Sequence, residues 1–268
     1  MADKQKKKCN KFSLVLTSLL ILASCYRPTS SIDPDLQTKV DSILQLKMSE
    51  INAISGQAIV LDIQKDEVKA MVGNGQKQSS SLMRPISLHK ALETGKVHLS
   101  DTVDTEEGIA IINGDTIKDH NWHRGGYGKI TLKQGLACNS SIAVAKAIQM
   151  AGVESVDSLV TPLEMLKLFN SIIKNDSLKS ALRYYITDGL GKQASSEKVE
   201  VAGFSGRSTI SNKNPEGIEY AVEFIGYFPA NAPKYSIIVS MNKKGLPASG
   251  GLMAGSVFKD IVDCMAAK

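Results

Sequence analysis

The sequence has few of the residues that mark disulfide-rich or nucleic-acid-binding proteins. Only four of its 268 residues are cysteine, so no disulfide framework is predicted. The formal net charge is +5, but residues 1–24 hold five lysines and one aspartate and account for +4 of it. The remaining chain is nearly neutral, so its composition gives no case for nucleic-acid binding, which needs a strongly basic face.

The amino-terminal apolar run is too short to span a bilayer as a mature helix. It covers residues 12–22, follows a lysine-rich segment and is separated from Cys25 by small residues. This order is typical of a secretory signal peptide with a lipobox-like end. We therefore expect residues 1–24 to be a lipoprotein signal peptide, Cys25 to carry the lipid and residues 25–31 to be the tether. The alternative is an uncleaved hydrophobic amino terminus.

Residues 32–268 contain no internal repeat or low-complexity block, and their length fits one domain with a substantial core. Apolar residues at helical spacing predict helices over residues 34–53, 81–94, 131–151, 163–174 and 255–265. Apolar and β-branched runs predict strands over residues 57–63, 67–72, 199–202, 220–228 and 236–241. Strands at both ends with helices gathered in the middle favour an α+β fold, in which terminal helices cover an antiparallel sheet.

Ser81 and Arg84 carry the clearest chemical signal in the chain. Their spacing matches a Ser-x-x-Lys nucleophile motif in which arginine has replaced the lysine. A lysine amine can lose its proton and act as a base, whereas a guanidinium stays protonated at any working pH. Ser81 is therefore a candidate nucleophile without a base. Alternatively, Ser81 caps a helix and Arg84 is a structural ion-pair partner.

Six further segments carry a family resemblance because they occur in that family's order. They are SIDPDLQ (31–37), GQAIVLD (56–62), LETGKV (92–97), DHNWHRGGYG (119–128), TPLEM (161–165) and IGYFPA (225–230). Over most of residues 32–268 the chain resembles the transpeptidase domain of class B penicillin-binding proteins. The resemblance implies a β-lactamase/transpeptidase-like fold. The stretch between Ser141 and Phe204 is shorter than this family leads us to expect, which implies a reduced helical subdomain.

The catalytic motifs of that family are largely lost in this sequence. The family transfers acyl groups through a serine, using Ser-x-x-Lys, Ser-x-Asn and Lys-Thr-Gly motifs. The resemblance places the second motif on Asn139 and Ser141 and the third on Phe204, Ser205 and Gly206. The proton-relaying hydroxyl, the substrate-binding amide and the lysine cation are thus replaced. Arg207 could restore a positive charge, although strand alternation puts it on the face opposite Phe204.

Three lost motifs on a retained scaffold favour a catalytically degenerate, lipid-anchored protein of the bacterial cell envelope, with its domain on the periplasmic side. It would bind peptidoglycan stem peptides or a cell-wall partner protein, with an extended peptide added as a strand along residues 201–207. The alternative is an active serine D,D-transpeptidase or carboxypeptidase that forms an acyl-enzyme on Ser81.

No cofactor or metal is expected, and no nucleic acid. Three other groups of residues are given structural roles. His120 and His123 lie near Asp119 but fall short of a full metal-ligand set. Trp122 and Tyr127 are expected to pack within their loop. Cys138 and Cys264 are expected to be small buried residues.

Overall fold

The computed structural model describes residues 31–75, 81–156, 158–211 and 217–267. Within this range, residues from Ile32 onward form one compact unit. The expected signal peptide, Cys25 and nearly all of the expected tether lie outside the described residues. Among the described residues, no helix combines the length and apolar character needed to cross a bilayer.

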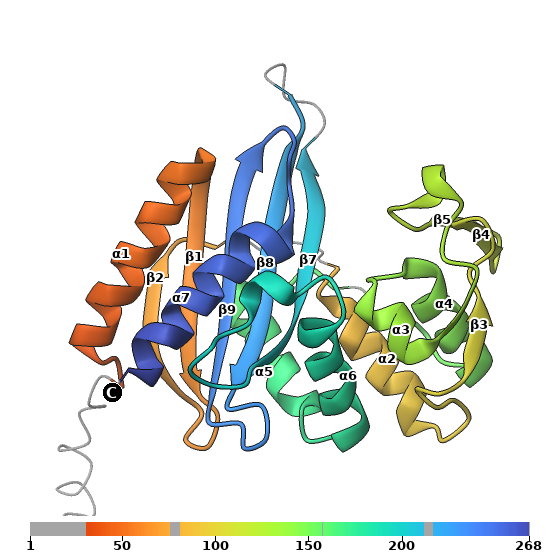
Figure 1. The fold of residues 1–268 in the computed structure, drawn as a ribbon, viewed down its shortest axis with the longest axis horizontal. Helices are drawn as coiled ribbons and strands as arrows, with labels where there is room; N and C mark the ends of the chain where they lie inside the picture. Colours follow the sequence, from red (N-terminus) through yellow and green to blue (C-terminus); the bar gives the residue numbers. More distant parts are fainter. Residues whose placement is uncertain (1–30, 76–80, 157, 212–216, 268) are drawn as a thin grey trace, which may run out of the picture. The chain divides into compact units, whose positions relative to one another are not determined.

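A five-stranded antiparallel sheet in the order β2-β1-β9-β8-β7 forms the centre of the domain (Figure 1). Its strands are β1 (Ala53–Asp62), β2 (Glu67–Gly73), β7 (Ala202–Ser211), β8 (Glu219–Phe228) and β9 (Tyr235–Lys244). The pairing of β1 with β9 joins the two ends of the domain, which confirms the predicted antiparallel sheet built from both. The order also makes β7 an edge strand.

The terminal helices α1 (Pro34–Ile51) and α7 (Gly255–Ala266) lie side by side on one face of the sheet (Figure 1). The backbone N–H of Leu36 donates to the Asp33 carboxylate at 3.0 Å, which caps α1 at its first turn. Helix α7 packs through an apolar face, and its Phe258 ring lies 4.8 Å from that of Phe224 in β8. This arrangement confirms that terminal helices cover the sheet.

The remaining elements, except η3, lie between β2 and β7 in the sequence. Most of them form the helical part beside the β7 edge, while α5 packs against β9 and β1 (Figure 1). The helices are α2 (Met83–Glu93), α3 (Leu132–Ala137), α4 (Ser141–Ala151), α5 (Pro162–Ile172) and α6 (Asp176–Thr187). The short strands are β3 (Thr102–Asp104), β4 (Ile109–Ile112), β5 (Asp115–Lys118) and β6 (Lys129–Thr131). Short helical turns are η1 (Trp122–Arg124), η2 (Lys192–Ala194) and the π-helical η3 (Gly250–Ala254).

The expected single helix over residues 131–151 is wrong, because the chain turns at Asn139. This residue has a left-handed backbone, with φ of 58°. The N–H groups of Asn139 and Ser140 close the end of α3 on the carbonyls of Leu136 (3.0 Å) and Gly135 (2.8 Å). Ser140 then caps α4. The break places Asn139 and Ser141 at a helix junction.

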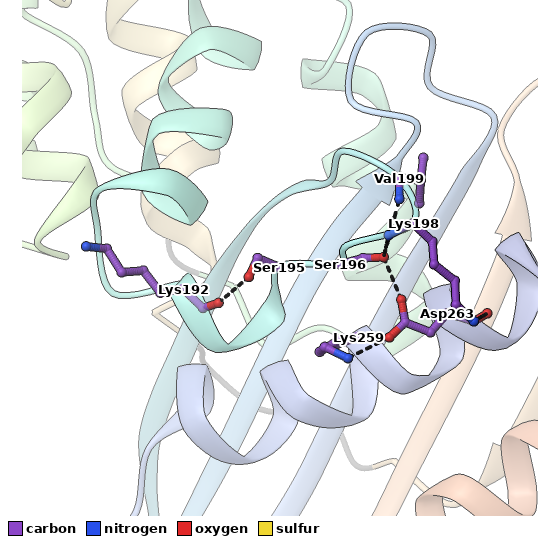
Figure 2. Close-up of polar contacts among 7 residues, drawn as sticks. All are labelled: Lys192, Ser195, Ser196, Lys198, Val199, Lys259 and Asp263. Carbon is purple, nitrogen blue, oxygen red and sulfur yellow. Dashed lines mark hydrogen bonds and ion pairs between the residues drawn. The ribbon is translucent and has the colours of Figure 1, made fainter.

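The segment that leads into β7 is fixed to α7 (Figure 2). The Ser196 hydroxyl donates to the Asp263 carboxylate at 2.5 Å, and Lys259 Nζ pairs with the same carboxylate at 2.6 Å. Lys198 Nζ donates to the backbone carbonyl of Asp263 at 2.9 Å. Burial alone would raise the pKa of Asp263, but the hydrogen bonds from Lys259 and Ser196 lower it. The network therefore holds the chain at the entrance to β7.

Candidate active-site cleft

A cleft of about 540 Å³ lies where β7, the start of α2, the α3–α4 junction and η3 meet. Its lining includes Ser81, Arg84, Asn139, Ser141, Ser205, Gly206 and Arg207. These are all of the residues assigned to the catalytic and substrate-binding positions except Phe204. Tertiary structure thus brings three short, widely separated segments to one place.

Ser81 lies on the turn before α2, and its hydroxyl is hydrogen-bonded to β7. Its Oγ accepts from the Arg207 N–H at 2.8 Å and lies 3.3 Å from the Arg207 carbonyl oxygen, to which it can donate. Helix α2 begins at Met83 without a side-chain cap, so Ser81 does not cap it. Among the described residues, no acid, lysine or histidine side chain is hydrogen-bonded to this hydroxyl.

The Arg84 side chain joins α2 to the α3–α4 junction. Its Nη1 donates to Asn139 Oδ1, and its Nη2 donates to Ser141 Oγ at 2.7 Å. Burial lowers the pKa of Arg84, while the nearby Asp119 opposes that shift. Arg84, Asn139 and Ser141 therefore complement one another: the arginine supplies donors, and the amide and hydroxyl oxygens accept the hydrogen bonds.

Asn139 connects this cluster to the sheet. While its Oδ1 accepts from Arg84, its Nδ2 donates to the Ser205 carbonyl of β7 at 3.3 Å. Asparagine tolerates the left-handed backbone found here better than most residues do. The helix junction and the hydrogen-bond network thus depend on the same residue.

Asp119 organises the wall of the cleft, a role that the sequence analysis missed. Its side chain is 1% exposed. One carboxylate oxygen accepts from the Ser140 hydroxyl at 2.7 Å, and the other accepts from the backbone N–H groups of Ser141 (2.6 Å) and Ile142 (3.2 Å). A buried carboxylate at a helix amino terminus is stabilised by these donors and by the helix dipole. No local sequence signal links residue 119 to the start of α4.

Phe204 lies outside the cleft. It is fully buried, and its ring centroid is 4.8 Å from that of Tyr185 in α6. The next residue, Ser205, shares a short hydrogen bond with the Tyr185 hydroxyl, and burial raises the pKa of Tyr185 to about 12. The position expected to hold a cation is therefore part of the apolar core. Arg207 is exposed and lines the cleft, as strand alternation predicts.

Among the described residues, the guanidinium of Arg207 uses only part of its hydrogen-bonding capacity. Its Nη1 lies 3.4 Å from the Ala248 carbonyl oxygen, and the guanidinium carbon is 5.7 Å from the centre of the Tyr220 ring. A guanidinium has five N–H donors. The Ala248 contact uses one of them, so the group can also bind an acceptor in the cleft.

The cleft lining is positively charged and has two exposed leucines. Arg84, Lys118 and Arg207 line it together with His120, and none of its described lining residues is acidic. Desolvation lowers the pKa of His120, and the arginines nearby lower it further, although Asp119 raises it. Leu190 and Leu252, which are 48% and 58% exposed, add apolar surface. The cleft thus suits a ligand with an anionic group.

Two expectations about neighbouring residues need correction. Trp122 packs only in part: its ring contacts that of His123 and lies 4.9 Å from Lys118 Nζ, but the residue is 46% exposed. Tyr127 does pack there, because its hydroxyl donates to the Cys138 carbonyl at 3.1 Å and its ring contacts His120. Cys138 and Cys264 are only partly buried.

Comparison with known proteins identifies the fold. No protein-family model and no curated protein matches the chain. The apo TP domain of penicillin-binding protein 3 from Burkholderia pseudomallei superposes with a TM-score of 0.74 and 19% identity, covering 90% of this chain and 96% of that one. A peptidoglycan glycosyltransferase from Burkholderia ambifaria gives 0.73 and 19%, covering 88% and 96%. The chain has the β-lactamase/transpeptidase-like fold of penicillin-binding-protein transpeptidase domains.

Proposed function

We propose that this protein is a catalytically degenerate, lipid-anchored protein of the cell envelope whose cleft binds the free carboxylate of a peptidoglycan stem peptide. The observation that carries this proposal is the hydrogen bonding of Arg84. Its guanidinium donates to Asn139 and Ser141, so it joins parts of the structure instead of serving Ser81.

Acyl transfer through Ser81 would require a group that takes the hydroxyl proton. Arg84 has no lone pair for it. The Ser81 hydroxyl is instead held by the backbone of Arg207, at 2.8 Å from its N–H. An unactivated hydroxyl is a poor nucleophile, which supports a binding role for the domain.

Carboxylate binding suits the charges that line the cleft. Arg207 is exposed, its guanidinium has one hydrogen-bond acceptor among the described residues, and it can bind a carboxylate through two parallel hydrogen bonds. β7 is an edge strand, where an extended peptide can add. At this edge Ser81 already accepts from the Arg207 N–H, and Asn139 already donates to the Ser205 carbonyl. A peptide that pairs there must displace these contacts. The Arg207 side chain therefore contributes more to peptide binding than strand pairing does.

The first test is for covalent reaction. Incubating the purified domain with a fluorescent β-lactam should give no stoichiometric mass increase in intact-protein mass spectrometry. An adduct that disappears in Ser81→Ala would overturn the proposal and support the alternative, an active serine D,D-transpeptidase or carboxypeptidase.

The second test measures binding of a stem peptide with a free carboxyl terminus by calorimetry. Arg207→Ala should weaken binding about thirty-fold, because a hydrogen bond to a charged group contributes about 2 kcal/mol. Arg124→Ala is the matched control, since Arg124 is exposed and does not line the cleft. If the parent does not bind the peptide, the stem-peptide proposal is wrong and a partner protein becomes the preferred ligand.

The membrane anchor has a separate test. Cys25→Ala should release the protein from membranes or block its processing, because Cys25 would be the lipidated residue. A variant that fractionates and migrates like the parent would remove the anchor from the proposal.

A further inference from the structure

Further hollows lie beyond the cleft, starting at Leu190. A hollow of about 240 Å³ shares Leu190 with the cleft and extends to Tyr184. A second hollow of about 500 Å³ shares Tyr184 with the first and reaches Lys133. A third, of about 580 Å³, shares Lys133, Asp176 and Ser180 with the second. Because neighbouring hollows share lining residues, they lie in a row beside α3 and α6, and we call this row the α6 groove.

The α6 groove carries charges of both signs. Lys179 pairs with Asp176 at 2.6 Å, and Arg183 pairs with Glu200 at 2.5 Å. Asp188 accepts from the Thr187 hydroxyl, and Lys133 Nζ is 3.3 Å from the Ser180 hydroxyl. A ligand that carries charge of one sign would meet like charges along the groove. The groove therefore fits a ligand without net charge.

The other polar groups of the groove are side-chain hydroxyls and amides. They come from Ser100, Thr131, Gln134, Ser177, Ser180, Thr187 and Asn231. Backbone N–H groups within the helices that form its walls are used inside those helices, so the helical walls cannot pair with an extended peptide as a strand edge can. Tyr184 adds a partly exposed ring, with Lys133 Nζ 4.7 Å from its centre. Hydroxyls and amides around an aromatic ring match a neutral, polyhydroxylated chain.

We infer that the α6 groove binds an uncharged glycan chain of N-acetylated amino sugars. This inference rests on the proposed function, because such a chain carries the stem peptides of peptidoglycan. The shared residue Leu190 places the groove directly next to the peptide cleft. A glycan that bears a peptide can therefore occupy both sites at once, and linking two weak sites raises the affinity for the whole ligand.

The test titrates a short peptide-free oligosaccharide of N-acetylglucosamine into the purified domain, followed by calorimetry. The parent should bind it, and Tyr184→Ala should weaken binding about tenfold through the lost ring contact. Ser180→Trp fills the groove from an exposed position and should have a similar effect without removing packing. Tyr184→Phe keeps the ring and should bind nearly as well as the parent. Thermal unfolding checks that each variant is folded.

The peptide and glycan measurements separate this inference from the proposed function. Stem-peptide affinity should be unchanged in Tyr184→Ala, and oligosaccharide affinity should be unchanged in Arg207→Ala. If the stem peptide binds but the oligosaccharide does not, the groove inference is wrong and the proposed function stands. If the oligosaccharide binds but the stem peptide does not, the stem-peptide proposal is wrong and the groove inference stands. Oligosaccharide binding that survives both Tyr184→Ala and Ser180→Trp would overturn the groove as its site.

Discussion

The cleft and the α6 groove lie next to each other but use their charged residues in opposite ways. Arg84, Lys118 and Arg207 line the cleft without a described acidic neighbour in its lining. The acidic residues of the groove are exposed and partnered, as in the pair of Lys179 with Asp176. Cations without an acidic neighbour in the described lining attract an anion, whereas exposed ion pairs contribute little free energy and leave hydroxyls and amides to select the ligand. The comparison indicates a ligand whose anionic part binds in the cleft and whose neutral part binds in the α6 groove.

The largest expected effect is on stability and concerns the buried charge behind the cleft. Asp119→Ala should lower the free energy of unfolding by about 3 kcal/mol, because it removes the acceptor for Ser140, Ser141 and Ile142. The matched groove variant, Asp176→Ala, should cost at most about 1 kcal/mol, since that side chain is 92% exposed. Chemical denaturation measures both. Equal losses would contradict the contrast between the two regions.

The next effect concerns the ligand. Replacing the stem peptide's carboxyl terminus by an amide should weaken its binding about thirty-fold, since the amide cannot form a charged pair with Arg207. In Arg207→Ala the acid and amide peptides should bind alike. Calorimetry with both peptides measures the difference. An amide that binds the parent as well as the acid would show that the cleft does not recognise the carboxylate.

Ionic strength should have a smaller effect than these substitutions, and it should change ligand affinity at the cleft but not at the groove. Raising the ionic strength from about 0.05 M to about 0.5 M should weaken stem-peptide binding about fivefold, because screening acts on the exposed charge of Arg207. Oligosaccharide binding should change little, since no charged group of that ligand is involved. Parallel titrations in the two buffers measure both. A salt effect of equal size on the oligosaccharide would argue against a neutral ligand site.

The smallest effect is on pH dependence. The pKa of His120 is lowered from its ordinary value of 6.5, so the imidazole is neutral at pH 7. As the pH falls through this lowered pKa, the new positive charge in the cleft should strengthen stem-peptide binding about threefold, while the peptide carboxylate stays ionised. The unfolded chain binds the proton at higher pH, so the same group makes folding less favourable as the pH falls below 6.5. His120→Gln should remove the change in affinity.

Much of the fold was predictable because its signals are local. Apolar spacing predicted α1, α2, α5 and α7, and apolar runs predicted β8 and β9. Helix α6 was missed, although Asn175 as its cap and the buried Leu178, Leu182 and Tyr185 form a recognisable helical pattern. The turn at Asn139 could not be predicted in this way, because residues 131–151 are apolar on both sides of it. Backbone contacts, and not the apolar pattern, end α3 there.

The sequence by itself determined that Arg84 cannot accept a proton, because the absence of a lone pair on a guanidinium is a property of its covalent structure. The resemblance to the transpeptidase family also predicted that Phe204 stands where that family has the lysine of its Lys-Thr-Gly motif. Only the tertiary structure decided that Arg84 binds Asn139 and Ser141, 55 and 57 residues away, and that Ser81 binds the backbone of Arg207, 126 residues away. Hydrogen-bond partners are chosen by the packing of distant segments, which no local pattern encodes.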